Sequence, residues 1–170
     1  MSDYSAVLFD LDGTLIDSAP GIFAALEATL AQYDIHPERS SLQKYLGPPL
    51  RKTFADFLPP EKIEAAVAHY RALYKVMGLE NVAPYGGIKE MLRALRKEGK
   101  TVCVATSKPR PVALQVLRAF DMEQYFDYVG GASMDSSLDT KTAVVAHVLA
   151  QPCLYGKNAV MVGDRDNDMQ

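Results

Sequence analysis

The sequence predicts an α/β fold, a doubly wound parallel β-sheet that carries an inserted α-helical cap. Three observations lead to this class: short apolar runs typical of buried strands, helical patterns between them, and one long helical stretch without a strand pattern. Each apolar run is brief and ends in Gly, Asp, Thr or Ser, which favours a strand over a helix. The candidate strands are Ala6–Phe9, Thr101–Ala105, Tyr128–Gly130 and Ala159–Val162.

The segments around the later strands have apolar residues at helical spacing. Helices are predicted over Gly86–Glu98, Pro111–Phe120 and Thr140–Leu149, and Gly99 provides a C-terminal signal for the first of them. Strands that alternate with helices of this length indicate βαβ units. The ligand site of such a sheet lies at the carboxyl ends of its strands, which is where the Asp-rich turns of this sequence fall.

The first strand is followed by a stretch of roughly sixty residues with helical patterns only. Helices are predicted over Ala19–Tyr33 and Glu61–Met77, and two proline pairs interrupt the segment between them. We interpret this stretch as an inserted helical cap. The predicted domains are a core of residues 1–17 and 80–170 and a cap of residues 18–79.

Composition excludes several classes of protein. The chain has 170 residues, 48% hydrophobic and 23% charged, which is ordinary for a globular protein. The net charge is -3 without a basic cluster, so a nucleic acid polymer is not an expected partner. We expect no membrane association and a cytoplasmic location, because no leader pattern or membrane-spanning apolar stretch is present. Cys103 and Cys153 are read as reduced structural thiols.

The strongest chemical signal is the pair Asp10 and Asp12, which directly follows the first strand. On an extended backbone residues i and i+2 face the same side, so the two carboxylates would share one small site. One can then serve as nucleophile or metal ligand and the other as acid or base, while Gly13 allows a sharp turn. A solvated turn or helix cap is the alternative, and it would be favoured if this pair stood alone.

Hydroxyl groups follow the second strand. Thr106, Ser107 and Lys108 offer two hydroxyls, N–H groups at a helix start and a cation, which together suit a phosphate. The alternative is that Thr106 or Ser107 caps the helix expected near Pro109. Both roles are compatible.

Two further segments complete the set. Lys141 opens the third helix after a polar loop, where a solvated surface lysine is the alternative reading. The last strand runs into Gly163 and a series of carboxylates that includes Asp164 and Asp168. Carboxylate oxygens of this kind suit Mg²⁺.

Taken in this order, the four segments resemble the haloacid dehalogenase superfamily of phosphohydrolases, and the resemblance covers nearly the whole chain. It implies a Mg²⁺-dependent phosphatase with a Rossmann-like core. Asp10 would attack phosphorus, and Asp12 would protonate the leaving oxygen and then activate water. Thr106, with Ser107 and Gly13, would hold the phosphoryl group.

The same resemblance implies the remaining roles. Lys141 would steady the nucleophile and the phosphate charge. The Mg²⁺ ligands would be the Asp10 carboxylate, the Asp12 backbone carbonyl and Asp164, with Asp168 behind them or acting through water. The superfamily normally continues with another helix, strand and tail, so the resemblance implies that a C-terminal part is missing here and that the last strand has an open edge.

The helical insertion resembles the branch with a small α-helical cap, within which bacterial 5'-nucleotidase-like members fit best and phosphoglycolate phosphatases are near neighbours. The expected substrate is a small phosphorylated metabolite, with Arg51 as a candidate substrate contact from the cap. Lys44 reads as a surface charge. Two alternatives stay open: a sugar-phosphate mutase, and a silent module that binds a phosphorylated ligand or a protein. Whether the chain has a protein partner is left open by the sequence.

Overall fold

The computed structural model describes residues 4–78, 80–133, 138 and 140–164. The chain divides into two compact units, one formed by Met1–Asp17 with Ala83–Gln170 and the other by Ser18–Val82. The sequence analysis placed the divisions after residues 17 and 79. Each unit is described by itself below.

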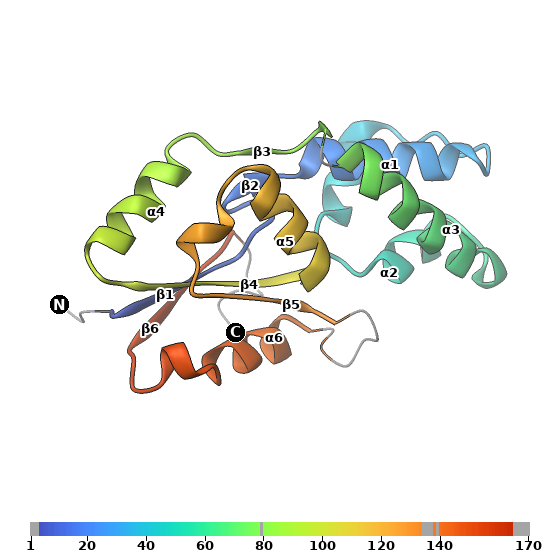
Figure 1. The fold of residues 1–170 in the computed structure, drawn as a ribbon. Helices are drawn as coiled ribbons and strands as arrows, with labels where there is room; N and C mark the ends of the chain where they lie inside the picture. Colours follow the sequence, from blue (N-terminus) through green and yellow to red (C-terminus); the bar gives the residue numbers. More distant parts are fainter. Residues whose placement is uncertain (1–3, 79, 134–137, 139, 165–170) are drawn as a thin grey trace. The chain divides into compact units, whose positions relative to one another are not determined.

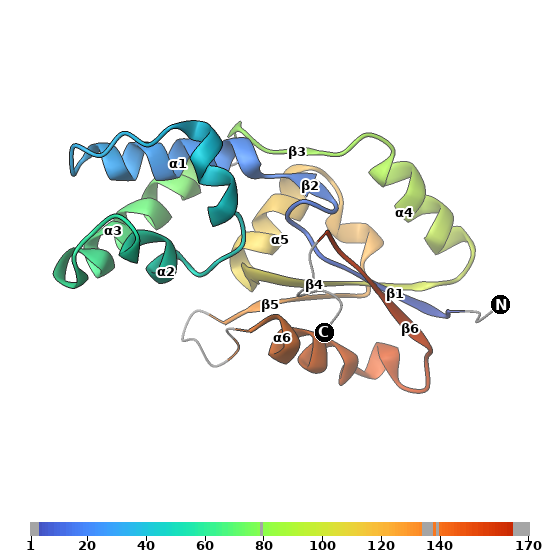
Figure 2. The same cartoon turned by 180° about the vertical axis from the view of Figure 1, so that it is seen from behind.

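The first unit is built on a parallel four-stranded sheet. Its strands are β1 (Ala6–Phe9), β4 (Thr101–Pro109), β5 (Tyr128–Ala132) and β6 (Ala159–Val162), in the order β5-β4-β1-β6. All three pairings are parallel. Helices α4 (Ile88–Lys97) and α5 (Arg110–Ala119) cover one face, and α6 (Lys141–Leu149) covers the other, as both ribbon views show (Figure 1, Figure 2). The predicted doubly wound α/β fold is confirmed.

Burial explains why β1 lies inside the sheet. Its four residues are all apolar and buried, and Val7 pairs with Val102 on one side and Val160 on the other. Alternate side chains of a strand point to opposite faces, so Leu8 packs with Cys103 against Val144 of α6. A strand that is apolar on both faces is typical of a parallel sheet between two helical layers.

Short elements complete this unit. β2 (Ile16–Asp17) and β3 (Ala83–Pro84) form a two-stranded antiparallel ribbon where the chain leaves and re-enters the unit. This ribbon was not predicted, because two residues are too few for a periodic pattern. Two short 3₁₀ turns, η3 (Glu123–Tyr125) and η4 (Pro152–Leu154), precede β5 and β6.

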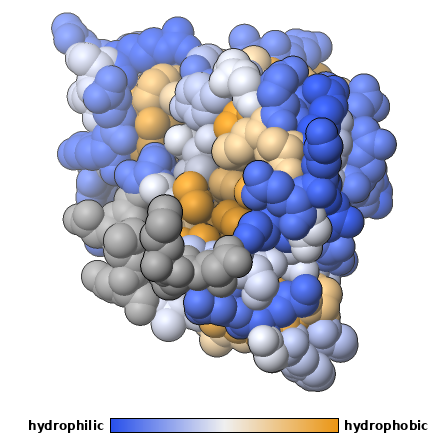
Figure 3. All heavy atoms as spheres, turned by 90° about the vertical axis from the view of Figure 1, so that its left-hand side faces the viewer, coloured by the Kyte–Doolittle hydropathy of each residue, from blue (hydrophilic) through white to orange (hydrophobic). Residues whose placement is uncertain are grey.

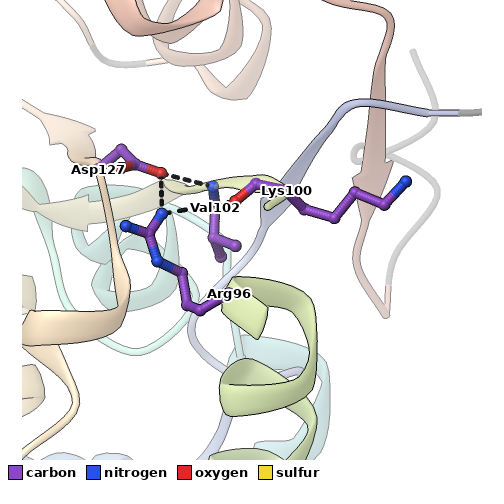
Figure 4. Close-up of polar contacts among 4 residues, drawn as sticks. All are labelled: Arg96, Lys100, Val102 and Asp127. Carbon is purple, nitrogen blue, oxygen red and sulfur yellow. Dashed lines mark hydrogen bonds and ion pairs between the residues drawn. The ribbon is translucent and has the colours of Figure 1, made fainter. Parts of the chain in front are cut away.

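Asp127 fastens the amino-terminal ends of β4 and β5 (Figure 4). Its carboxylate accepts a hydrogen bond of 2.9 Å from Val102 N–H, while its own N–H donates to the Val102 carbonyl at 2.8 Å. Arg96, at the end of α4, forms an ion pair with the same carboxylate and reaches the Lys100 carbonyl at 3.5 Å. Helix, strand and strand are therefore joined at the edge opposite the polar turns.

The second unit consists of helices joined by loops, and its described residues include no strand. It contains α1 (Ala19–Ala31), the 3₁₀ helix η1 (Arg39–Tyr45), α2 (Leu50–Ala55), α3 (Pro60–Leu73) and the π-helical turn η2 (Tyr74–Gly78). Gly21 of α1 lies so close to η2 that a β-carbon there would stand 2.7 Å from the Gly78 carbonyl oxygen. Pro49 and Pro59 stand at the N-caps of α2 and α3, so each proline pair marks a helix start.

β6 lies at the edge of the sheet, paired with β1, in the part of the chain that the structure describes. Its residues are half-buried except Val162, which is exposed, although all four are apolar. Seen from the left of Figure 1, the molecular surface carries hydrophobic side chains in its middle and hydrophilic ones around them (Figure 3).

No helix among the described residues is long and apolar enough to cross a membrane.

The element ends differ modestly from the predictions. β1 and β6 match, whereas β4 runs four residues further, to Pro109, and β5 two further, to Ala132. The extension of β4 includes a shift of pairing register between Thr106 and Pro109, which no local pattern could indicate. The helix η1 and α2 were not predicted, because both are short and depend on packing.

Candidate active site

Asp10 is the first residue after β1 and lies at the carboxyl edge of the sheet. Its N–H donates to the Val162 carbonyl at 2.9 Å, which ties the ends of β1 and β6 together. Its Oδ1 accepts a 2.8 Å hydrogen bond from Leu11 N–H, and the residue is only 7% exposed. A carboxylate held in this way has a fixed direction and is shielded from water.

A tight loop follows Asp10. Gly13 has φ +82°, a left-handed conformation that glycine adopts without strain, and its N–H donates to the Ile16 carbonyl at 2.9 Å. The Asp164 carboxylate rests against this glycine, since a β-carbon on Gly13 would lie 2.8 Å from Asp164 Cγ. The first and last predicted motifs therefore meet at the ends of two paired strands.

Lys141 reaches Asp10 from the start of α6. Its Nζ lies 2.8 Å from Asp10 Oδ1, and the two side chains are 7% and 10% exposed. Thr140 caps α6 by accepting a 3.2 Å hydrogen bond from Ala143 N–H. This cap fixes the start of the helix, where Lys141 lies. The surface-lysine alternative is wrong for Lys141, which is a buried partner of Asp10.

The end of β4 supplies a second lysine. Lys108 Nζ lies 2.9 Å from Asp12 Oδ2, with the lysine side chain 7% exposed and the Asp12 side chain 22% exposed. Thr106 is buried, and its Oγ1 accepts a 3.2 Å hydrogen bond from Lys108 N–H. Pro109 is the N-cap of α5 and no side chain caps that helix, so the capping role considered for Thr106 and Ser107 is wrong.

Two polar atoms of the loop are buried without a hydrogen-bond partner among the described residues. They are Oδ1 of Asp12 and Oγ1 of Thr14. A buried oxygen in this state is costly unless something else satisfies it, and in a polar site a ligand, an ion or water can do so. The described chain thus leaves acceptor capacity next to the Asp10 carboxylate.

A family model for haloacid dehalogenase-like hydrolases matches residues 7–170 of this chain. The chain belongs to this family. The family that the four motifs predicted is therefore confirmed.

Two curated relatives show how this haloacid dehalogenase-like chain compares with full-length proteins. It is 40% identical over 164 residues to the tyrosine-protein kinase PtkA of Mycobacterium tuberculosis, which covers 96% of this chain and 56% of that protein. It is 36% identical over 169 residues to a 5'-nucleotidase of Pseudomonas aeruginosa, covering 98% of this chain and 76% of that one. The chain thus spans little more than half the length of the kinase relative.

The fold comparison agrees. A haloacid dehalogenase-like hydrolase from Streptococcus pneumoniae superposes with a TM-score of 0.90 at 29% identity, covering 99% of this chain and 80% of that one. The helical unit is part of this match, because it lies within the 99% that is covered. The family core and its helical insertion therefore occur together in a solved structure.

The oxygen ligands expected for Mg²⁺ are partly described. Asp10 and Asp164 follow the paired strands β1 and β6, and hard carboxylate oxygens of this kind are what Mg²⁺ takes. Asp168 lies outside the described residues. Within the described ranges no group of three or more His, Cys, Asp or Glu side chains is placed to hold a metal ion. The donor chemistry fits Mg²⁺, for which the Asp10 and Asp164 carboxylates and the Asp12 backbone carbonyl are the expected ligands among the described residues.

Tyr85 is a site residue that the sequence did not reveal. It follows β3, and its N–H donates to the Leu15 carbonyl at 3.1 Å, which places it beside the loop that follows Asp10. Burial raises the pKa of its phenol, and the charges of Asp17, Asp164 and Asp12 raise this pKa further. Tyr85 lies near these carboxylates because it follows the β2–β3 ribbon. The sequence carried no periodic signal for this ribbon.

Arg51 lies on α2 in the second unit. Its guanidinium forms hydrogen bonds of 2.5 Å and 3.0 Å with the two Glu64 carboxylate oxygens, and both side chains are exposed. Lys44 lies 3.9 Å from Asp56, in keeping with the surface charge that was expected. The structure thus brings together Asp10, Asp12, Gly13, Thr106, Lys141 and Asp164 in the first unit. Ser107 is exposed beside Thr106.

Proposed function

We propose that this chain is a Mg²⁺-dependent phosphomonoester hydrolase that works through a phosphorylated Asp10 and acts on nucleoside 5'-monophosphates. The observation that carries the proposal is the buried pair of Asp10 and Lys141, 2.8 Å apart at the carboxyl edge of the sheet. A carboxylate that is shielded, oriented and partly neutralised is suited to attack an anionic phosphoryl group.

In the first step the Asp10 carboxylate attacks phosphorus, and an Asp10–phosphorus bond forms as the ester oxygen leaves. Asp12, two residues further along the same loop, gives a proton to the departing oxygen. In the second step water attacks the phosphorus and loses a proton to Asp12. The Asp10–phosphorus bond breaks, and inorganic phosphate and the free carboxylate are restored.

The surrounding groups handle the negative charge of the phosphoryl group. Lys141 places an ammonium against Asp10, which reduces repulsion between the nucleophile and the substrate oxygens. The Thr106 hydroxyl, whose oxygen already accepts Lys108 N–H, is oriented to donate its proton to a phosphoryl oxygen. Ser107 and the backbone at Gly13 are the remaining proposed phosphate contacts.

Mg²⁺ would be held by Asp10, the Asp12 carbonyl and Asp164, with Asp168 as the outer carboxylate. When bound, it supplies positive charge that stabilises the developing charge of phosphoryl transfer. Phosphate monoester hydrolysis is so slow without a catalyst, with enzymes accelerating it up to ~10²¹-fold, that charge stabilisation from several groups is needed.

The substrate class is supported by the relative named 5'-nucleotidase, of which this chain covers 76%. Phosphoglycolate is the alternative substrate that the motifs suggested. Arg51 is proposed to contact the substrate, and it would have to leave its surface pair with Glu64 to do so. Surface ion pairs of this kind are weak enough to be exchanged for a phosphate.

The relative named as a tyrosine kinase shows that a sequence 40% identical carries a different named activity. Overall identity therefore does not decide the reaction of this chain. We propose hydrolysis because Asp12 follows Asp10 by two residues in the same loop, where it could activate water.

The deciding experiment is phosphate release with Mg²⁺ and with EDTA over nucleoside 5'-monophosphates, phosphoglycolate and sugar phosphates. We expect metal-dependent release with a preference for nucleotides, and its loss in Asp10→Asn, because an amide is a poor nucleophile and metal ligand. Retained turnover in Asp10→Asn would contradict the mechanism. A preference for phosphoglycolate would correct the substrate class.

Two further arms test the other activities. Transfer of phosphate from ATP to a protein tyrosine, without phosphate release from small esters, would favour the kinase activity. Turnover of sugar phosphates only when a sugar bisphosphate is added would favour a mutase. Binding of phosphorylated ligands without any turnover would favour a silent module.

A further inference from the structure

We propose that Lys108 is a positioning residue that aims the Asp12 carboxylate at the attacking water when phosphorylated Asp10 is hydrolysed. This inference rests on the proposed function, because it assigns a second lysine to the same site. In this arrangement Lys141 pairs with the nucleophile Asp10. Lys108 pairs with Asp12, the proposed acid and base.

The two oxygens of Asp12 are in different states. Oδ2 lies 2.9 Å from Lys108 Nζ, and the lysine side chain is 7% exposed. Oδ1 is buried and accepts no hydrogen bond from the described residues. An ion pair through one oxygen fixes the rotation of the carboxylate and so the direction of the other. Lys108 therefore holds the Asp12 carboxylate in one orientation.

Lys108 is itself placed by an irregularity of β4. Thr106 pairs with Gly131 and Pro109 pairs with Ala132, so Ser107 and Lys108 are extra residues relative to β5. Such bulges commonly redirect a side chain next to an active site. The Lys108 N–H donates to Thr106 Oγ1 at 3.2 Å, which stabilises the turn locally.

Gly131 supports the same segment from β5. A β-carbon at Gly131 would stand 2.6 Å from the Lys108 carbonyl oxygen and 2.8 Å from Arg110 N and Cα. These are backbone atoms, which cannot turn aside as a flexible side chain can. The strands approach this closely because residue 131 is glycine, and this approach sets the position of Lys108.

The orientation matters most in the second step. Water attacks the phosphorus of phosphorylated Asp10, its proton passes to the Asp12 carboxylate, and the Asp10–phosphorus bond breaks with its electron pair returning to Asp10. With p-nitrophenyl phosphate the first step needs no proton donor, since the leaving group is stable as an anion.

The test is rapid-mixing kinetics of Lys108→Met with p-nitrophenyl phosphate and Mg²⁺. We expect a burst of about one p-nitrophenol per active site, then slow turnover, with kcat reduced by up to ~10²-fold as for a misplaced catalytic group. Because only the second step slows, KM should fall with kcat, and kcat/KM should stay within a few-fold. Acid quenching should trap a phosphorylated protein.

Two further variants serve as controls for this result. Asp12→Asn removes the base itself and should give the same burst. Lys100→Met makes the same substitution at the opposite end of β4, where the lysine donates to the Tyr4 carbonyl at 2.8 Å, and should turn over like the unmodified chain. A Lys108→Met variant with reduced kcat/KM and no burst would overturn the inference, because a structural defect slows both steps.

Failure of the proposed function looks different. If the unmodified chain releases no phosphate, or if Asp10→Asn remains active, both the proposed function and the role of Lys108 fall. If the unmodified chain works through Asp10 but Lys108→Met turns over normally, only the role of Lys108 falls.

Discussion

Lys141 and Asp10 form an ion pair that is almost closed to solvent, with Nζ 2.8 Å from Oδ1 and side chains 7% and 10% exposed. Removing one partner of a buried pair costs about 3–5 kcal/mol, because a buried charge loses its counter-charge. Lys141→Met should therefore lower both the stability of the chain and the phosphatase activity proposed for it. Chemical denaturation and phosphate release measure the two effects.

A double-mutant cycle separates this pair from general damage. Asp10→Asn with Lys141→Met should be less destabilising than the sum of the two single changes, because the neutral amide no longer needs the ammonium. Additive losses would mean that the two side chains do not interact in solution.

Gly131→Ala should displace the segment that carries Lys108. The added methyl group would meet the backbone of Lys108 and Arg110, so the expected result is the Lys108→Met behaviour: a burst followed by slow turnover. Gly130→Ala is the matched control, because its methyl group would meet the Val148 side chain on the α6 face. That variant should lose stability without a burst. A burst in both variants, or in neither, would contradict the proposal that Gly131 sets the position of Lys108.

Asp127→Ala should destabilise the first unit. The substitution removes the carboxylate that accepts the 2.9 Å hydrogen bond from Val102 N–H (Figure 4). It also removes the ion-pair partner of Arg96. The loss of a partly buried acceptor of this kind costs about 1–3 kcal/mol. Because the site lies at the other end of the strands, kcat should stay unchanged below the melting transition. Glu123→Ala, which removes an exposed pair with Arg118, should have a much smaller effect on stability.

The sequence indicated the central strands and the candidate site residues because these depend on local signals. β1 is a short, fully buried apolar run that stops at Asp10, and both ends were predicted correctly. The pairing of Lys108 with Asp12 depends instead on β4 lying next to β1, although the helical unit separates them in the chain. The bulge that aims Lys108 depends on Gly131 in a third strand. Local patterns contain no information of this kind.

Cys103 provides a prediction about pH. Burial raises the pKa of its thiol from 9.0 to about 12, and the neighbouring Cys153 contributes through its charge and a hydrogen bond. Between these pH values the unfolded chain has lost the thiol proton, whereas the folded chain keeps it. The stability from this group is therefore complete below pH 9.0 and is lost as pH rises towards 12.

The expected slope is about 1.4 kcal/mol of unfolding free energy per pH unit, which is the free energy of a one-unit pKa difference. Urea denaturation of the unmodified chain and of Cys103→Ala, at a series of pH values above 8, measures it. Other groups titrate in this range in both proteins, so the difference between the two slopes isolates Cys103. Parallel slopes would contradict this prediction, because they would show that the thiol titrates alike in the folded and unfolded chains. Rapid alkylation of Cys103 in the folded chain at pH 9 would also contradict it, because the thiolate is the reactive form.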